Sequence, residues 1–384
     1  MTKLILIVLF LLTGLLTGSA SVLAQEETLI EQLPTDFVEQ TAPQVEYYQA
    51  RVTDLVSEQK DEDPYAMIFD QYIQKVFAVF LNGPEKGAGK IIEFYPKSDD
   101  DDQKLKVGDK VYVLKITDGD VVSYNITEHY RFNALLWLTI IFIGLVVLVG
   151  RWQGLGSLVG LAFSFLVIIK FMVPRILAGQ SPLIICLLGA MMIALVSIYI
   201  AHGFKLRTTL AVISTLLTIM ITLGFDYLVI HWAKLFGAGT EEAVFAQFAQ
   251  FGTINLRGLL LGGIIVGVLG VLDDITTAQA AVVDELKKAK PEMTFKELYR
   301  AGISVGKEHI ASLVNTLVLA YVGASFPLVL LFQQYNQPLT YLLNSELVAE
   351  EIARTLIGST ALILAVPLTT ALTAYVLTRK KASL

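Results

Sequence analysis

The chain divides into two parts that differ in their pattern of hydrophobic and polar residues. Short segments with alternating apolar and polar residues fill 25–131, whereas long apolar runs begin at Phe132 and continue almost to the C-terminus. A helix needs roughly 20 mostly apolar residues to cross about 30 Å of hydrocarbon. By this criterion the pattern predicts about seven membrane-spanning helices, at residues 132–150, 154–173, 182–201, 208–230, 258–283, 309–332 and 352–377.

The polar part is predicted to be a small β-rich domain. Turn signals rich in glycine, asparagine and aspartate separate short segments of strand character. Candidate strands are residues 46–56, 74–81, 91–95, 110–117 and 121–127. About five short strands of this kind are typical of a small barrel, such as an OB-like fold. The predicted fold class is therefore mostly α, a polytopic membrane bundle preceded by a small exported β-rich domain.

The first 24 residues have the pattern of a secretory signal segment. Lys3 precedes a short apolar run, and small residues then lead to Ala24, where cleavage is expected. An uncleaved membrane anchor is the alternative interpretation. In both cases the β-rich domain at 25–131 is exported.

The distribution of positive charge agrees with this orientation. Cytoplasmic loops of membrane proteins are enriched in lysine and arginine. If the β-rich domain lies outside, the inner loops contain most of the basic residues. We therefore expect a membrane protein with an extracytoplasmic N-terminal domain, a helical bundle at 132–378 and a basic cytoplasmic tail at 379–384.

Composition narrows the class of protein further. The chain is 54% hydrophobic and only 17% charged, and its mean hydropathy is +0.62, which is too apolar for an ordinary soluble domain. A net charge of −6 argues against nucleic acid as a partner. The single cysteine, Cys186, excludes an intrachain disulfide. The sequence has no nucleotide-binding loop, CxxC or HExxH, so we expect neither a cofactor nor an enzymatic activity.

The most informative stretch is 257–285, where an apolar run contains Asp273 and Asp274 side by side. A carboxylate inside a membrane span is costly unless a polar group or water receives it. At helical spacing, Asp274 shares a stripe with Gly263, Gly267 and Gly270, and small residues allow another helix to approach closely. We therefore expect Asp274 to face a neighbouring helix or a polar cavity.

The next span enters from the same side of the membrane, so its polar residues can meet the acidic pair at one depth. The predicted ion- or substrate-binding set is Asp273, Asp274, Thr277, Gln279, His309, Ser312, Asn315 and Thr316. Carboxylate, hydroxyl and amide oxygens suit a proton or a hard cation, although no metal can be specified. Adjacent carboxylates also disfavour joint ionisation. The alternative is a hydrogen-bonded interhelical clamp that only stabilises the fold.

Three other features are expected to have local roles. Asp226 and His231 lie at the outer end of the fourth span and are candidates for an external vestibule. Thr240 has the position of an N-cap, and 241–252 is predicted to be an amphipathic helix. Inside, a new helix is expected to begin near Thr294, after Pro291.

Two segments of the bundle resemble the YibE/F-like family of bacterial multi-pass membrane proteins. They are LGVLDDITTAQAAVVDEL at 269–286 and GKEHIASLVNTLVLAYVGASFPLVLL at 306–331. The predicted order of domains, an exported N-terminal domain followed by a multi-span bundle, also resembles that of the family. The resemblance implies a fold and a location in the bacterial cell membrane, and it supplies neither a substrate nor established site residues.

Three functions are compatible with these patterns. The leading one is an ion- or proton-coupled transporter or permease, whose partners are the lipid bilayer and a small ion or solute. The second is a sensor or assembly factor in which the external domain binds a ligand or a protein. The third is an intramembrane aspartyl hydrolase, which would need Asp226 and one of the adjacent aspartates to share a water molecule.

Overall fold

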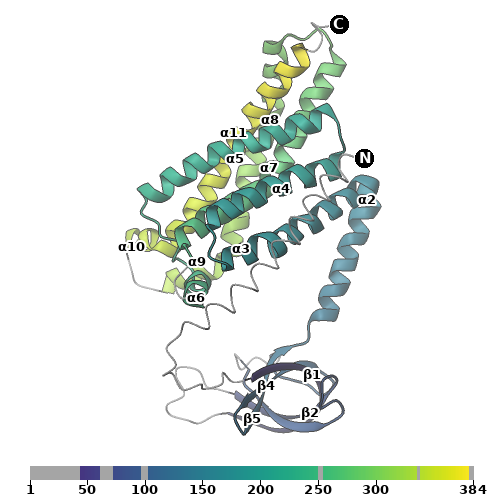
Figure 1. Cartoon of the computed structure of the whole chain (residues 1–384), viewed down its shortest axis with the longest axis vertical. Helices are drawn as coiled ribbons and strands as arrows, with labels where there is room; N and C mark the ends of the chain where they lie inside the picture. The colour runs from purple at the N-terminus through teal and green to yellow at the C-terminus, as the bar shows by residue number, and fades with distance from the viewer. Residues whose placement is uncertain (1–43, 61–71, 97–102, 250–253, 335–337, 380–384) are drawn as a thin grey trace. The chain divides into compact units, whose positions relative to one another are not determined.

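The computed structural model describes residues 44–60, 72–96, 103–249, 254–334 and 338–379 (Figure 1). The predicted signal segment at 1–24 and residues 380–384 of the predicted basic tail lie outside the described residues. The chain forms two compact units, and their boundary lies between Leu145 and Val146. The first unit contains the β-strands, and the second contains most of the helices.

The β-rich unit is a closed five-stranded barrel. Its strands are β1 (Gln44–Lys60), β2 (Tyr72–Phe80), β3 (Gly89–Phe94), β4 (Lys110–Asp118) and β5 (Val121–His129). They close in the order β1-β2-β3-β5-β4, and only the β3–β5 pair is parallel. The predicted small barrel is therefore confirmed, and each strand lies within a few residues of the expected segment.

Closure of the barrel depends on the long strand β1. Its first half pairs with β4 and its second half with β2, and irregularities between Val52 and Asp54 and between Leu55 and Ser57 interrupt its register with β2. Bulges of this kind bend and twist a strand. The strand can therefore pair with β4 and with β2, which closes the barrel.

Every second side chain along the strands points into the barrel interior and fills it. Val76, Ala78 and Phe80 of β2 are almost fully buried, whereas Phe77 between them is exposed. Side chains of a strand point alternately to its two faces, so this pattern places every second residue in the core. The Phe77 ring lies over Gly89, where a Cβ atom would be only 2.2 Å from the ring. A larger residue at position 89 would therefore have to displace the Phe77 ring.

A charged cluster joins the β2–β3 connection to β4 and β5. Glu85 forms ion pairs with Lys90 (2.8 Å) and Lys115 (3.1 Å), and its carboxylate accepts a hydrogen bond from the Tyr124 hydroxyl (2.7 Å). Lys90 first, and then the Tyr124 hydroxyl and Lys115, lower the pKa of Glu85 to about 2. The cluster therefore stabilises the barrel only while Glu85 is ionised.

The remaining described chain is helical. Its elements are α2 (Phe132–Val167), the π-helix η1 (Ile168–Met172), α3 (Val173–Leu177), α4 (Pro182–His202), α5 (Leu206–Trp232), α6 (Glu241–Ala249), α7 (Leu256–Ala289), α8 (Phe295–Ala324), α9 (Phe326–Gln334), α10 (Leu339–Asn344) and α11 (Glu346–Arg379). The predicted N-cap at Thr240 is confirmed, because its hydroxyl accepts a hydrogen bond from Ala243 N (3.3 Å). The predicted helix start at Thr294 is also confirmed, as a capping box with Glu297.

Within the described residues, five helical segments are long and apolar enough to cross a membrane. They are Phe132–Leu177, Pro182–His202, Leu206–Trp232, Leu256–Ala289 and Glu346–Arg379. The first is interrupted at Arg151, whose φ of 48° is not helical, and it divides there into the first two expected spans. The five segments therefore cover six of the seven expected spans. The remaining expected span, 309–332, begins in α8, which is not among the five segments and has charged residues through its first half.

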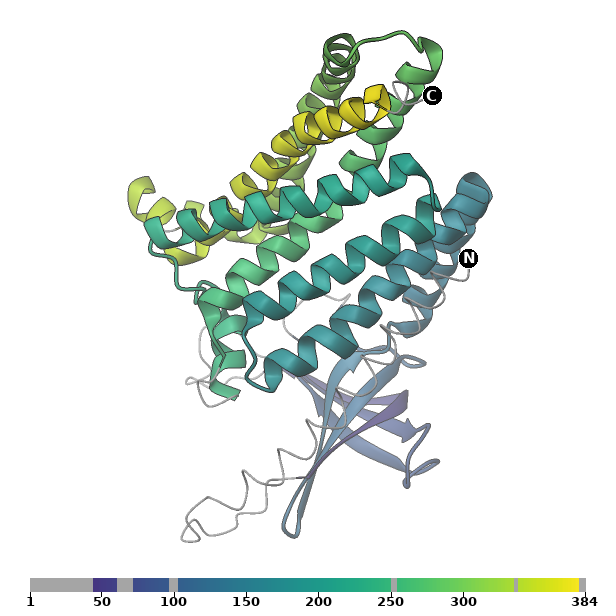
Figure 2. The ribbon, with the colours of Figure 1, turned by 45° about the horizontal axis from the view of Figure 1, so that its top comes forward.

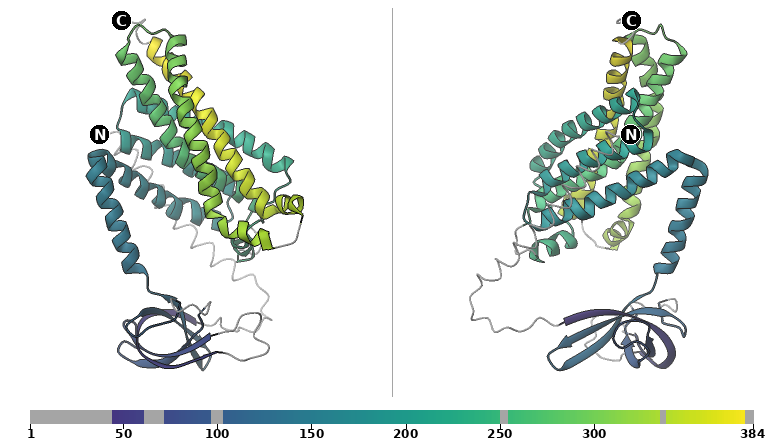
Figure 3. Two further views of the ribbon diagram at one scale, coloured as in Figure 1. Left: turned by 180° about the vertical axis from the view of Figure 1, so that it is seen from behind. Right: turned by 45° about the vertical axis from the view of Figure 1, so that its right-hand side comes forward.

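Helix α7 lies at the centre of the bundle. It packs against α4, α5, α8 and α11, while α11 also packs against α5 and α8. Figure 2 shows α11 in yellow beside α5 in teal, and the left view of Figure 3 shows α11 along the green helices. Small residues allow these close contacts. A Cβ atom at Gly262 would lie 2.6 Å from Cys186 Sγ, and one at Gly306 would lie 2.4 Å from Val366 Cγ1.

Replacement of Gly306 tests the close approach of α8 to α11. We expect Gly306→Leu to lower the free energy of unfolding by about 1–3 kcal/mol, as overpacking of a filled interface does. Gly323→Leu is the matched control, because a Cβ atom at Gly323 of the same helix meets nothing within 4 Å. Thermal unfolding in detergent compares the two variants. Equal unfolding temperatures would contradict the packing described.

The Glu85 cluster predicts a pH-dependent stability of the barrel. The pKa of Glu85 is lower in the folded state than its ordinary value of 4.5, so its contribution is present above about pH 5 and is lost as the pH falls towards 2. Glu85→Gln should therefore destabilise the barrel at pH 7, and the difference from the parent should shrink near pH 3. Hydrogen exchange of barrel peptides in the full chain, at matched pH, measures this difference. A difference that is unchanged at pH 3 would contradict the assignment.

Candidate ion site in the helical bundle

The acidic pair lies on α7, and its two carboxylates have different surroundings. Asp273 is half-buried, and its Oδ1 atom is buried with no hydrogen-bond partner among the described residues. Asp274 is exposed. The Thr277 hydroxyl donates to the backbone oxygen of Asp273 (2.8 Å), so it is already engaged by its own helix. Of this group, Asp273 has the carboxylate oxygen that most needs a partner.

Gln279 lies where α7, α8 and α11 meet. It is fully buried, and its Nε2 donates to the Gly302 oxygen (2.8 Å) and to Thr370 Oγ1 (2.7 Å). Gly302 and Gly306 leave the space for this side chain, since a Cβ atom at Gly306 would approach both the amide and Val366. Gln279 therefore links three helices, and its geometry is that of an interhelical clamp.

The four predicted site residues of α8 differ in their exposure. His309 is half-buried, and its Nδ1 is buried with no hydrogen-bond partner in the described chain. Ser312, Asn315 and Thr316 are exposed, and the Thr316 hydroxyl donates to the Ser312 oxygen (3.0 Å). The structure thus brings Gln279 against α8 but does not gather all eight predicted residues in one pocket.

Helical geometry explains this division. α7 meets α8 through the face that contains Gln279, and Asp274 is five residues away, or about 140° around the helix. Thr277 instead lines a cavity of about 200 Å³ with His202 and Thr208, where α4 ends and α5 begins. We call this the small cavity. Arg207 also lines it, and its guanidinium is 3.4 Å from a Glu285 carboxylate oxygen of α7.

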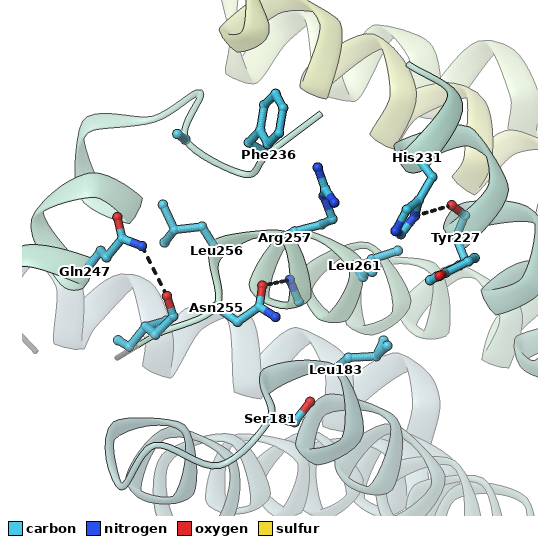
Figure 4. Close-up of a pocket in the computed structure, with 13 residues that line it drawn as sticks. Ser181, Leu183, Tyr227, His231, Phe236, Gln247, Asn255, Leu256, Arg257 and Leu261 are labelled. Carbon is cyan, nitrogen blue, oxygen red and sulfur yellow. Dashed lines mark hydrogen bonds between the residues drawn. The ribbon is translucent and has the colours of Figure 1, made fainter. Parts of the chain in front are cut away.

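A larger cavity lies at the opposite end of α5 and α7 (Figure 4). It has a volume of about 830 Å³ and polar walls that include Tyr227, His231, Asn255 and Arg257. We call it the large cavity. The structure places His231 in its wall, whereas Asp226, the other vestibule candidate, is fully buried and is not among its lining residues.

The walls of the large cavity are held by specific contacts. Asn255 caps α7 by accepting from Gly258 N (3.0 Å), and Arg257 Nε donates to the Leu235 oxygen (2.9 Å). Glu346 of α11 accepts hydrogen bonds from Phe236 N (2.6 Å) and Ala238 N (3.4 Å). The loop after α5 is therefore fixed to both α7 and α11.

A buried polar stripe runs along α5, and the sequence interpretation missed most of it. Thr215 Oγ1 is 2.7 Å from Thr276 Oγ1 of α7, and both side chains are fully buried. Thr222 and Asp226 lie further along the same stripe, and the Thr222 hydroxyl and both Asp226 carboxylate oxygens are buried without partners among the described residues. The signal in the sequence is the spacing of Thr208, Thr215 and Thr222, which repeats every seven residues.

The same contact fixes the distance between the aspartates of the two helices. α5 and α7 are antiparallel, and Thr215 is level with Thr276. From this level, helix rise puts Asp226 roughly 16 Å along α5 and Asp273 roughly 4 Å along α7 in the same direction. The two carboxylates are therefore about 12 Å apart along the bundle, whereas a catalytic aspartate pair must share one water molecule.

A small barrel followed by apolar helices, with polar groups buried between them, defines a multi-pass membrane protein. The family model of the YibE/F-like proteins matches residues 138–379, which is more than half of the chain, and the chain belongs to this family. The resemblance seen in the α7 and α8 sequences is thereby confirmed. Comparison with the curated proteins finds no match, and neither does comparison with the solved structures.

The Gln279 clamp can be tested by a double-mutant cycle. We expect Gln279→Ala and Thr370→Ala to be coupled by about 0.6 kcal/mol, and by no more than about 1.7 kcal/mol, as for other hydrogen bonds between membrane helices. Gln279→Ala with Thr355→Ala is the control, because the Thr355 hydroxyl bonds to Glu351 O of its own helix. The measurement is unfolding in detergent. Additive effects for Gln279 and Thr370 would contradict the clamp.

Proposed function

We propose that this membrane protein is a transporter or permease coupled to a proton or a small cation, and that Asp273 and Asp274 form its coupling site. The observation that supports this proposal is the buried Oδ1 atom of Asp273 on the central helix α7, which has no hydrogen-bond partner among the described residues. A carboxylate in such a position is costly unless a proton, an ion or water reaches it. Ionisable residues inside membrane bundles are therefore candidates for proton or ion pathways.

The two neighbouring carboxylates add to this argument. Two adjacent carboxylates disfavour joint ionisation, so the pair can gain or lose one proton or exchange it for a cation. Asp274 is exposed on α7, next to the helical face of Thr277 that lines the small cavity. An ion that enters through this cavity would reach Asp274 first and Asp273 second.

We also propose the orientation in the membrane. Lys205, Arg207, Lys287 and Lys288 gather where α5 begins and α7 ends, and the Arg207–Glu285 contact joins these two ends. Positive charge of this kind favours the cytoplasmic side. The barrel would then be extracytoplasmic, the C-terminus cytoplasmic, and the protein a component of the bacterial cell membrane.

A sensor or assembly factor is the second candidate, and one feature of the barrel favours it. Phe77 and Ile91 are paired across β2 and β3, and their side chains are 37% and 59% exposed. Barrels of the OB type bind ligands on the face formed by these strands. In this alternative the barrel binds a ligand or protein outside, and the bundle relays the signal to a partner.

Flux through the full chain in proteoliposomes tests the proposal. Proton movement is followed with a trapped pH-sensitive dye under an imposed potential, and sodium uptake with a radioactive tracer. We expect flux of one of these ions above that of protein-free liposomes. Asp273→Asn and Asp274→Asn should each remove it, because the carboxylate that accepts the ion is lost.

Glu292→Gln is the matched control, since Glu292 is an exposed carboxylate in the α7–α8 connection. It should transport like the parent. Membrane protein level and elution in size-exclusion chromatography must be equal for all variants. Parent-like flux in both aspartate variants would refute the coupling site. No flux in the parent, together with a ligand bound by the barrel, would favour the sensor.

A further inference from the structure

The buried face of α5 contains a row of polar groups that the coupling site does not use. Thr208, Thr215, Thr222 and Asp226 follow one another at intervals of seven, seven and four residues, so they lie on one stripe of the helix. The exposed fractions of these side chains are between 0% and 2%. We call this row the α5 polar file.

Most of these groups have no partner in the described part of the chain. The hydroxyls of Thr208 and Thr222 and both carboxylate oxygens of Asp226 are buried and unpaired there. Buried polar atoms in proteins are paired in the great majority of cases, with protein atoms or with ordered water. Since several such atoms follow one helix face, one shared partner that extends along the file is the simplest explanation. A chain of water molecules is such a partner.

The file extends from one cavity towards the other. Thr208 at its first end lines the small cavity, and Tyr227, the neighbour of Asp226 at its second end, lines the large cavity. From Thr208 to Asp226 the helix rises roughly 27 Å, which is close to the thickness of the hydrocarbon layer. The file therefore extends over most of a membrane and ends near a polar cavity on each side.

Helix α11 contributes a second set of polar groups. It packs against α5, and the hydroxyls of Ser359, Thr369 and Thr373 are buried without partners in the described chain. Pro367 lies inside the same helix and has no N–H to offer to the carbonyl of Ile363, which frees a further acceptor. Hydroxyls and carbonyls on two packed helices can hold water between them.

We propose that a proton path runs along the α5 polar file from the small cavity to the large cavity, and that Asp226 is its proton-carrying carboxylate. This inference rests on the proposed transport function and names its route. A hydroxyl can accept one proton and donate another, and water does the same, so the file can relay protons. Asp226 is the one ionisable group on the file, and its neighbour in the sequence, Tyr227, lines the large cavity.

The chemistry favours a proton over a metal cation. A hard cation such as Ca²⁺ takes 6–8 oxygen ligands, usually with several carboxylates. Among the described residues there is no group of three or more histidine, cysteine, aspartate or glutamate side chains that could hold a metal. The threonines of the file are about 10 Å apart along the helix, so they cannot surround one ion. They can hold a row of water molecules.

The test uses proton flux through the full chain in proteoliposomes with the trapped dye. We expect Asp226→Asn to reduce flux to the protein-free level, and Thr222→Val, which keeps the side-chain shape, to reduce it severalfold. Ser214→Ala is the control, because Ser214 is equally buried on α5 but lies about 100° around the helix from Thr215, and its hydroxyl donates to the Leu210 oxygen (2.8 Å). It should leave flux unchanged. If Asp226→Asn fails to fold, Thr222→Val against Ser214→Ala still decides.

Infrared difference spectra give a second measurement, the carbonyl band of the Asp226 side chain, whose response to D₂O does not follow from a purely structural role. The parent minus Asp226→Asn spectrum should contain a carboxylic-acid carbonyl band, and this band should shift promptly in D₂O because water reaches the group. A band that does not shift, or parent-like flux in both Asp226→Asn and Thr222→Val, would overturn the route. If proton flux is parent-like in both of these variants but is lost in Asp273→Asn, the transport proposal stands and the route along the α5 polar file does not. A parent without proton flux refutes the route, and sodium uptake then decides on transport.

Discussion

A polar group between membrane helices needs a partner, because the surrounding hydrocarbon supplies none. The bundle of this protein is arranged around that constraint. Small residues bring α8 within contact of α7 and α11, and the Gln279 amide then satisfies its donors with Gly302 and Thr370. The Thr215–Thr276 hydrogen bond does the same between α5 and α7. These contacts stabilise the helix interfaces, and Gln279 Oε1 is left without a hydrogen-bond partner among the described residues.

Other polar groups in the same bundle are not satisfied in this way. Asp273 Oδ1, His309 Nδ1 and both oxygens of Asp226 are buried without protein partners among the described residues. A fold selected only for stability would replace such groups with apolar ones, since an unpaired buried polar atom costs free energy. Water or an ion can supply the missing partners, and the positions of these groups on α5 and α7 mark where we propose that a proton or ion passes.

Much of the architecture could be predicted from the sequence, because it follows from local periodicity. Alternation and turn residues located the five strands of the barrel, and apolar runs located α4, α5, α7 and α11. The membrane bundle and the family resemblance are both confirmed. The candidate site was predictable only in part. Sequence spacing orders residues along one helix, but the neighbour that each face meets depends on packing between helices.

Gln279 and Asp274 illustrate this limit. Both were expected to face α8, and only Gln279 does, because the two residues are about 140° apart around α7. The α5 threonines were visible in the sequence at heptad spacing. Threonine is common in membrane helices as a hydroxyl that bonds to its own backbone, as Thr218 does, so the spacing alone did not reveal which hydroxyls lack a partner.

In our proposals, water or an ion meets the unpaired polar groups of the bundle interior. Electron cryo-microscopy of the full chain in lipid nanodiscs, at a resolution that shows ordered water, tests it most directly. We expect discrete density within hydrogen-bonding distance of Asp273 Oδ1, Thr222 Oγ1 and the Asp226 carboxylate. A dry interior in which these same atoms are hydrogen-bonded to protein would contradict it.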